Sequence, residues 1–355
     1  MKIGILTYHY AHNYGAILQA VALSDYLTNI GHDVVFINYK NSNVSRIYKI
    51  FPSINFSIKS VLTYVPLSIM RFLRFSSFQH YAKKHIKTIS VNELAQLNCI
   101  IIGSDQVWNP KLTNGLDKTY WGNIHCQCPI IAYAPSIDKS SINQQEEDEI
   151  KHYLNNFSFI SVREYTSKIL LEKLTNKKIQ VVADPTVLND HLYWKNKCKK
   201  INSNRYILAY YLRDKDEVLS IAKKIAKEKH MKLKIFKGST NWNPISKEMN
   251  IAGPQKLLNY INNAHLVITS SFHGTALSIL FHKNFYSIKC KDGNNERIHN
   301  LLKITKLEDR FIKNNDFFDF ENNINYINVE QHLNEYRTTS ISYLKEALST
   351  IKTNK

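Results

Sequence analysis

The chain has 355 residues, more than a single hydrophobic core usually holds, and its length favours two domains. Its 44% hydrophobic and 21% charged residues are typical of a globular protein and argue against a disordered or fibrous chain. The formal net charge of +18 favours anionic partners: a phosphorylated substrate, a membrane surface or nucleic acid. Because the basic residues are scattered and no zinc-finger or RNP-type motif accompanies them, nucleic acid is not expected as a partner.

The cysteines and the N-terminal residues indicate the cellular compartment of the protein. Five cysteines form neither an even disulfide framework nor a credible metal set, so reduced thiols and no metal site are expected. The sequence MKIGILTYHY begins like a β-strand, since its apolar stretch is too short for a signal peptide. A cytoplasmic protein is therefore expected.

The first part of the chain contains a βαβ unit. Residues 2–7 predict a strand, residues 16–29 a helix that Gly31 ends, and residues 33–38 the next strand. Further short apolar runs at 98–102, 130–134 and 159–162 also end in polar residues. This recurrence is typical of a parallel sheet with a cleft along one edge.

The second part repeats the alternation of strands and helices. The pattern predicts strands at 205–212, 233–236, 266–269 and 285–289, and helices at 216–229, 256–263, 297–305 and about 329–349. We expect an N-terminal domain over 1–190 with a helical insertion at about 45–90, a C-terminal domain over 200–328, and a helix at 329–352 that packs back on the first domain. Two such domains imply a cleft between them.

Residues 58–75, IKSVLTYVPLSIMRFLRF, combine apolar and basic side chains but are too short for a membrane span. One interpretation is a helix lying on an anionic membrane surface, with Lys59, Arg71 and Arg74 facing the head groups. The favoured alternative is an inserted helix packed against the first domain, because Pro66 is expected to interrupt any long membrane-facing helix.

The stretch LVITSSFHGTALSILF at 266–281 predicts a strand, a tight turn and a helix. Ligands of open α/β sheets bind beyond the carboxyl ends of the strands, where helix N-termini attract anions. His273 falls at that position, where an imidazole acts as an acid or a base near neutral pH. On these residues alone, a histidine that only caps a turn is an equally good interpretation.

Six motifs in order resemble those of the polysaccharide pyruvyl transferase family, over about residues 1–312. They are NYGAILQ at 13–19, IIGSDQVWN at 101–109, SVRE at 161–164, ADPT at 183–186, TSSFHG at 269–274 and RIHNLLKITKLEDR at 297–310. The resemblance implies two Rossmann-like domains facing a central cleft, similar to the GT-B glycosyltransferase fold. It also implies transfer of the pyruvyl group of phosphoenolpyruvate to two sugar hydroxyls, which forms a cyclic ketal, releases phosphate and requires no cofactor.

The expected acceptor is a cell-surface polysaccharide or a lipid-linked glycan precursor. Such an acceptor would also account for peripheral contact between the protein and the inner face of the plasma membrane. Two alternatives stay open: a GT-B glycosyltransferase that uses a nucleotide sugar, and a noncatalytic glycan-assembly protein that retains the fold.

The resemblance assigns residues to the donor half of the cleft. His273 is expected to protonate C3 of the donor or to assist the leaving phosphate. Arg163 is expected to clamp the donor anions, although an ion pair with Glu164 or another carboxylate is the structural alternative. Some family members have Arg two residues before the motif His, where this chain has Ser271, a departure that also leaves room for a different donor. The proposed replacements for that arginine are Ser271, Gly274, Thr275, Lys289 and Arg297.

The acceptor half is expected at the ends of the first-domain strands. Asp105 is the candidate base or hydroxyl ligand, and a helix cap is its structural alternative. Trp108 is expected to stack on a sugar ring beside Gln106. Asn13, Tyr14 and Gly15 complete the predicted acceptor site, although Gly15 could simply permit a turn and Tyr14 could serve packing.

Overall fold

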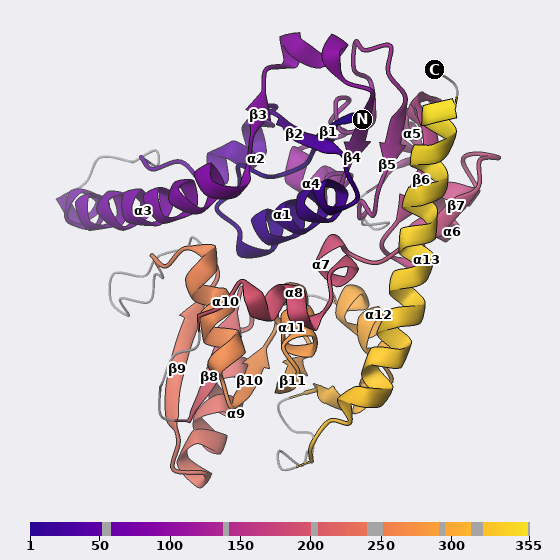
Figure 1. The fold of residues 1–355 in the computed structure, drawn as a ribbon. Helices are drawn as coiled ribbons and strands as arrows, with labels where there is room; N and C mark the ends of the chain where they lie inside the picture. The colour runs from indigo at the N-terminus through magenta and orange to yellow at the C-terminus, as the bar shows by residue number, and fades with distance from the viewer. Residues whose placement is uncertain are drawn as a thin grey trace.

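A computed structural model of the chain describes residues 1–51, 58–137, 142–199, 205–239, 251–290, 295–313 and 322–353. It contains a seven-stranded sheet and a five-stranded sheet, and every strand pair is parallel. The two sheets belong to two layered α/β units, one above the other in Figure 1. The predicted fold class, two Rossmann-like domains, is therefore confirmed.

The first sheet has the strand order β3-β2-β1-β4-β5-β6-β7. Its central strands are completely apolar runs because helices cover both faces of a parallel sheet. The strands are β1 (Lys2–Leu6), β2 (Asp33–Ile37), β3 (Thr88–Ile89), β4 (Cys99–Ile102), β5 (Ile130–Ala132), β6 (Phe157–Val162) and β7 (Ile179–Val181). The helices of this part are α1 (Tyr14–Asn29), α2 (Ser42–Ile47), α3 (Ile58–His85), α4 (Pro110–Thr113), α5 (Gln144–Tyr153) and α6 (Tyr165–Glu172).

The second sheet has the strand order β12-β11-β10-β8-β9. Strand β10 lies at its centre and is buried along its whole length. The strands are β8 (Tyr206–Tyr211), β9 (Lys232–Lys237), β10 (Leu266–Thr269), β11 (Asn284–Ile288) and β12 (Phe311–Ile312). The helices are α9 (Lys215–Glu228), α10 (Pro254–Asn263), α11 (Phe272–Leu280) and α12 (Glu296–Thr305).

Two connections join the sheets. Short helices α7 (Pro185–Leu188) and α8 (His191–Asn196) lead from the first sheet to the second. Helix α13 (Tyr326–Thr353) follows the second sheet and runs alongside both units (Figure 1). Its hydroxyls bond the first unit: Tyr336 donates to the carbonyl of Val182 and Tyr343 to that of Ala132.

Helix α1 lies between the two units and positions the site. Twelve of its 16 residues are buried, which is expected of a helix covered on more than one side. Ile17 and Leu18 join a core cluster with Leu277 of α11, whereas Ala20 and Leu23 pack with strands of the first sheet. The first turn of α1 therefore faces the second unit.

Helix α3 corrects part of the sequence interpretation. It continues through Pro66 instead of ending there, since an internal proline removes one hydrogen bond and need not stop a helix whose later turns are packed. Phe78 and Tyr81 are buried in the core cluster that contains Leu257 of α10. The side chain of Lys59 lies outside the described residues. No helix in the described part of the chain combines the length and hydropathy needed to cross a bilayer.

Arg74 does not face head groups, because it is 1% exposed and bonded inside the protein. Its Nη2 donates to the carbonyl oxygens of His12 and Gly238, at 2.9 and 2.7 Å, and its guanidinium lies over the ring of Tyr14. His12 belongs to the first unit and Gly238 follows β9 of the second. A single side chain of α3 therefore binds both units.

Candidate active site

The turn after β10 directs His273 toward the first unit. Ser271 caps α11: its Oγ accepts a hydrogen bond from the Gly274 N–H, and its carbonyl accepts from the N–H and hydroxyl of Thr275. The strand, turn and helix expected from the sequence are all present. The cap uses the N–H groups of Gly274 and Thr275, however, so these are not available to bind a donor oxyanion as expected.

Gly15 explains how His273 fits against α1. A Cβ atom at Gly15 would lie 2.0 Å from Nδ1 of the imidazole, so only glycine allows this approach. Asn13 caps α1 by accepting from the N–H groups of Gly15 and Ala16. Tyr14 is fully buried and donates to the carbonyl of Ala252, which is the packing role held open for it.

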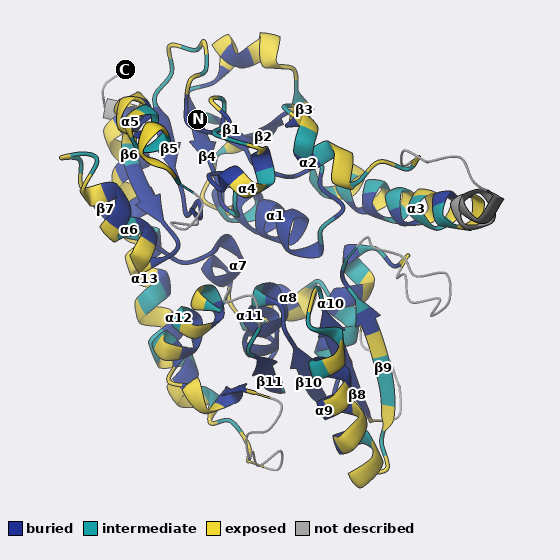
Figure 2. Cartoon of the chain, turned by 180° about the vertical axis from the view of Figure 1, so that it is seen from behind, coloured by how far each residue is buried: buried dark blue, intermediate teal, exposed yellow. Residues whose placement is uncertain are grey.

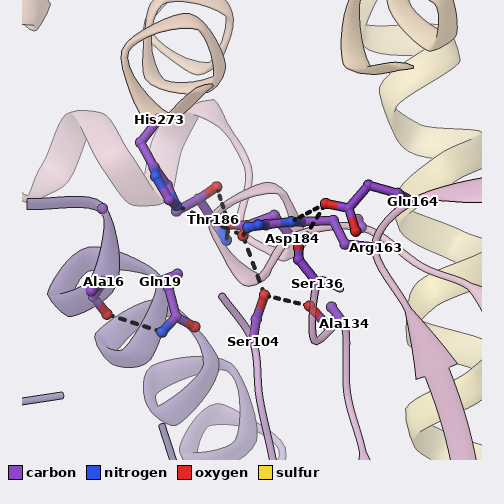
Figure 3. A network of polar contacts seen from close by, with 12 residues as sticks. Ala16, Gln19, Ser104, Ala134, Ser136, Arg163, Glu164, Asp184, Thr186 and His273 are labelled. Atoms are coloured by element: carbon purple, nitrogen blue, oxygen red, sulfur yellow. Dashed lines mark hydrogen bonds and ion pairs between the residues drawn. The ribbon is translucent and has the colours of Figure 1, made fainter. Parts of the chain in front are cut away.

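The other end of the imidazole faces a buried carboxylate. Nε2 of His273 lies 3.7 Å from Oδ2 of Asp184, and within the described structure it has no hydrogen-bond partner. Figure 3 shows the imidazole pointing toward Asp184, with Arg163 beyond it. Asp184 Oδ1 accepts from the N–H and hydroxyl of Thr186, and Ser104 donates to Oδ2 at 3.4 Å. Asp184 belongs to the ADPT motif, but the sequence interpretation gave it no role.

Asp184 remains ionised in this setting. Burial alone would raise its pKa, but nearby His273 and Arg163, together with the Thr186 N–H, hold the pKa well below its usual range. An ionised carboxylate at this distance compensates the positive charge that His273 carries when protonated. The arrangement suits an imidazole that acts as a general acid.

Arg163 is a corrected prediction. It is 5% exposed, its Nη1 lies 2.7 Å from Asp184 Oδ2, and its Nε lies 3.0 Å from Glu164 Oε1. Burial opposes the charged form, but Glu164, Asp184 and Asp105 outweigh it and raise the pKa of Arg163. The structural alternative, an ion pair, is therefore the one observed. Arg163 lies behind His273 and does not line the cavity between the two units.

A cavity of about 350 Å³ opens between the two units in front of His273. Five predicted site residues line it: Asn13, Asp105, Gln106, Ser271 and Arg297, in addition to His273. The volume is that of a pocket for a small organic ligand. The cavity collects residues from the ends of β1, β4 and β10, as expected for carboxyl ends of parallel strands.

Asp105 and Gln106 face this cavity from the first unit. Asp105 has a φ of 70°, in the left-handed region, and such strain at a non-glycine residue is concentrated at functional sites. It does not cap α4, whose N-cap is Asn109. With its amide oriented to satisfy hydrogen bonding, Gln106 accepts from both terminal nitrogens of Arg297, at 2.7 and 2.9 Å.

Arg297 is the predicted donor ligand that reaches the cavity. Burial, reinforced by the nearby charge of Arg163, lowers its pKa. Lys289 is not among the lining residues, and its Nζ lies 5.2 Å from the ring centroid of Phe311. The cavity also has a second arginine, Arg213, that sequence reasoning missed.

Trp108 is another correction. It is 1% exposed, stacks on Trp121 with ring centroids 4.3 Å apart, and donates from Nε1 to the carbonyl of Tyr120. A side chain buried in this way belongs to the core and does not stack on a sugar. Tryptophan often stacks on sugars, but here Trp108 packs in the hydrophobic core although Gln106, two residues before it in the sequence, lines the cavity.

His12 is a cavity residue that could have been found from its place directly before the NYG motif. Burial, together with Arg74 and Lys40, lowers its pKa to about 4, so its imidazole is neutral near pH 7. A neutral imidazole accepts or donates a hydrogen bond without adding charge. Within the described ranges, no cluster of three His, Cys, Asp or Glu side chains is arranged to hold a metal ion.

These features define a two-domain α/β protein with a candidate acid–base site in the cleft between its domains. The model of the polysaccharide pyruvyl transferase family matches residues 13–292, and the chain belongs to that family. The family resemblance drawn from the six motifs is thus confirmed. The family name denotes transferases that act on polysaccharides.

No curated protein sequence matches the chain. Solved structures similar to it include the UDP-GlcNAc 2-epimerase from Neisseria meningitidis, 11% identical over 100% of both chains with a TM-score of 0.49. The UDP-GlcNAc 2-epimerase from Methanocaldococcus jannaschii is 14% identical over 99% of this chain and 100% of its own, with a TM-score of 0.49. SsfS6, a glycosyltransferase from Streptomyces sp. SF2575, is 11% identical over 98% and 99%, with a TM-score of 0.40.

Proposed function

We propose that the protein transfers the pyruvyl group of phosphoenolpyruvate to two hydroxyls of a sugar in a cell-surface glycan precursor. The observation that supports this most strongly is the position of His273, aimed into a cavity between the domains and backed by an ionised Asp184. Family membership supports the polysaccharide as the acceptor class. Transfer from phosphoenolpyruvate requires an acid at the donor carbon, and His273 takes that role in the proposal.

The donor carries a phosphate and a carboxylate, so it needs cationic side chains in the cavity. Arg297 and Arg213 line the cavity and take this role in the proposal. Arg163 then acts from behind, by holding Asp184 and its charge in place. Some family members have an arginine at the position of Ser271. In this proposal, Arg297 of α12 takes the place of that arginine.

In the proposed reaction, His273 gives a proton to C3 of the donor, and positive charge develops at C2. A sugar hydroxyl attacks C2, forming a C–O bond while Asp105 accepts its proton. The bond between C2 and the phosphate oxygen then breaks, and the phosphate stays in the cavity. The second hydroxyl attacks the same carbon, gives its proton to the phosphate and closes the ketal, after which the phosphate leaves. The proton held by Asp105 returns to His273 through solvent, so both groups are restored. The two hydroxyl protons thus account for the one gained by C3 and the one gained by phosphate.

The acceptor in this proposal is lipid-linked and lies at the cytoplasmic face of the membrane. The test incubates the protein with phosphoenolpyruvate and a galactose- or mannose-bearing lipid, then measures phosphate release and a mass gain equal to one pyruvate ketal. We expect both products with phosphoenolpyruvate and no turnover with UDP- or GDP-sugars. Sugar transfer from a nucleotide donor, with no reaction of phosphoenolpyruvate, would contradict the proposal.

The matched variant is His273→Asn, which keeps a polar side chain but removes the acid. We expect turnover to fall by at least about 10²-fold, because general acid catalysis contributes roughly that factor. Circular dichroism and the thermal midpoint serve as controls for folding. A near-normal rate would leave His273 with a structural role only.

A further inference from the structure

The segment around α2 and α3 is basic without any acidic residue. Residues 34–92 contain no Asp or Glu, in a chain that has 29 of them, and hold nine of its 47 basic residues. Arg74 is buried, whereas Arg46 and Lys49 of this segment are exposed. The segment therefore presents positive charge that no acidic residue of its own offsets.

The same segment exposes large apolar side chains. Val65, Ile69, Phe72 and Leu73 follow helical spacing on α3 and are 40–55% exposed. Figure 2 shows α3 projecting beyond the body of the protein, with exposed positions along it. A contiguous exposed apolar surface on a globular protein marks a contact site.

The turn after α2 extends this surface. Nη1 of Arg71 donates to the carbonyl of Lys49 at 2.8 Å and thereby joins that turn to α3. Ile47 and Phe51 flank this contact and are 45% and 67% exposed. We call the whole surface the α2–α3 patch; its apolar members are Ile47, Phe51, Val65, Ile69, Phe72 and Leu73.

The α2–α3 patch reaches the mouth of the cavity. Ile47 belongs to the patch and also lines the cavity, together with Val44 and Tyr48 of the same segment. A molecule held on the patch is therefore next to the cavity that contains His273. This continuity distinguishes the patch from isolated exposed residues such as Leu192 and Ile327.

We propose that the α2–α3 patch docks the protein on an anionic lipid bilayer. Apolar side chains flanked by Lys and Arg are the composition that binds the interface of an anionic bilayer. A second copy of the chain, packed patch to patch, would bring like charges together, which charge complementarity disfavours. The location beside the cavity adds a role that rests on the proposed function: the lipid of the acceptor stays in the bilayer while its sugar enters the cavity.

The test is co-sedimentation of the full chain with vesicles of phosphatidylcholine alone or with phosphatidylglycerol added. We expect binding to the vesicles that contain phosphatidylglycerol, weakened by high salt, and little binding to phosphatidylcholine alone. The double variant Ile69→Gln, Phe72→Gln is expected to bind at least about a hundredfold more weakly, because each apolar side chain buried in the bilayer contributes roughly a factor of ten or more. Arg46→Glu with Lys49→Glu tests the charge separately and is expected to abolish the preference for phosphatidylglycerol.

The matched control is Leu192→Gln with Ile327→Gln, two apolar residues outside the patch that are more exposed than Ile69 and Phe72. Vesicle binding that is absent, or that the control weakens as much as the patch variant does, would overturn the proposal. So would a concentration-dependent dimer in light scattering that the patch variant dissociates. Phosphate release with a soluble acceptor separates the two proposals: intact turnover without vesicle binding refutes only docking, and vesicle binding without turnover refutes only the proposed function.

Discussion

The charge on Asp184 links two residues that the sequence places far apart. Its Oδ2 lies 2.7 Å from Nη1 of Arg163 and 3.7 Å from Nε2 of His273. His273, Arg163 and the N–H group of Thr186 together keep the carboxylate ionised, and the carboxylate faces the imidazole. In the proposed function Asp184 is a positioning residue, since it would affect the donor only through His273.

Asp184→Asn should lower turnover by at least about tenfold, because the imidazole of His273 loses the carboxylate charge that faces it at 3.7 Å. Glu164→Gln is the control, because Glu164 pairs with Arg163 without facing His273. Both variants are expected to lose stability, up to about 3–5 kcal/mol for a broken buried pair. An equal loss of turnover in both variants, or a loss in neither, would contradict the assignment.

His12 makes stability depend on pH. Burial, Arg74 and Lys40 lower its folded-state pKa to about 4, whereas the unfolded value is about 6.5. The unfolded chain therefore binds a proton that the folded chain does not, and stability falls as the pH drops below about 6.5.

Between pH 7 and pH 5, the unfolding free energy of the wild type should fall by about 2 kcal/mol more than that of His12→Asn. Urea titrations of both proteins at the two pH values measure this difference. The comparison cancels the other titrating groups, which the two proteins share. Equal losses would show that His12 titrates normally in the folded state.

At the residue level, the sequence indicated several side chains that line the cavity but did not indicate which are buried behind it. His273 was expected from its strand, turn and helix pattern together with the family resemblance, and Asp105 and Arg297 were expected from the resemblance; all three line the cavity. Trp108 was misassigned because its partner, Trp121, is brought close only by tertiary packing. Arg163 was misassigned for the same reason: its buried ion pair with Asp184 joins two different strand ends.

At the scale of elements, the first turn of α1 is fitted to the tip of α11. Gly15 contributes the space that the His273 ring occupies. Alanine at this position would be the better helix former by about 0.5–1 kcal/mol in an isolated helix. The steric and helix-forming effects of Gly15→Ala therefore oppose each other, and the experiment decides between them.

We expect Gly15→Ala to reduce turnover and lower the thermal midpoint, because a Cβ atom 2.0 Å from Nδ1 forces the ring or the helix to move. Phosphate release and differential scanning calorimetry measure the two effects. Gly31→Ala, at a φ of 89° with no neighbour within 4 Å of its Cβ, controls for a glycine substitution that strains only the backbone. A stabilised and fully active Gly15→Ala protein would refute the contact.

Most long elements could be predicted because they repeat hydrophobic residues over several turns or form continuous buried strands, but helices α5 and α6 were not predicted. Strands β3, β7 and β12 were not predicted. Each has only two or three residues, too few to show a periodic pattern of hydrophobic residues. Helix α3 was expected to break at Pro66 on a local rule. Its later turns are held by contacts with α10, which no local rule contains.

For the whole molecule, α13 makes the second domain depend on the first. It begins after the second sheet, yet Leu344 is fully buried in the core cluster that includes Ile3 and Ile101 of the first sheet. Tyr343 of the same helix donates to the carbonyl of Ala132. The two domains should therefore unfold together.

Leu344→Ala should destabilise the protein by about 2–5 kcal/mol, as expected for a large-to-small change in a core. A single unfolding transition, followed by tryptophan fluorescence and by far-ultraviolet circular dichroism, should shift as a whole to lower urea. Two separate transitions, with only one of them shifted, would show that the domains are independent. Glu346→Ala, on the exposed side of the same helix, is the control.

The contacts of Arg74 restrict how the length of the α3 segment can change among related proteins. A segment inserted between two strands of a sheet is ordinarily the part of a chain most easily shortened or replaced. Here the guanidinium of one residue in the insertion bonds main-chain carbonyls that belong to separate domains. A relative that lost the segment would leave both carbonyls without this donor and the two domains without this tie. Changes in its length should therefore be confined to the part before Arg71, while the turns from Arg71 to His85 are inherited with the cleft itself.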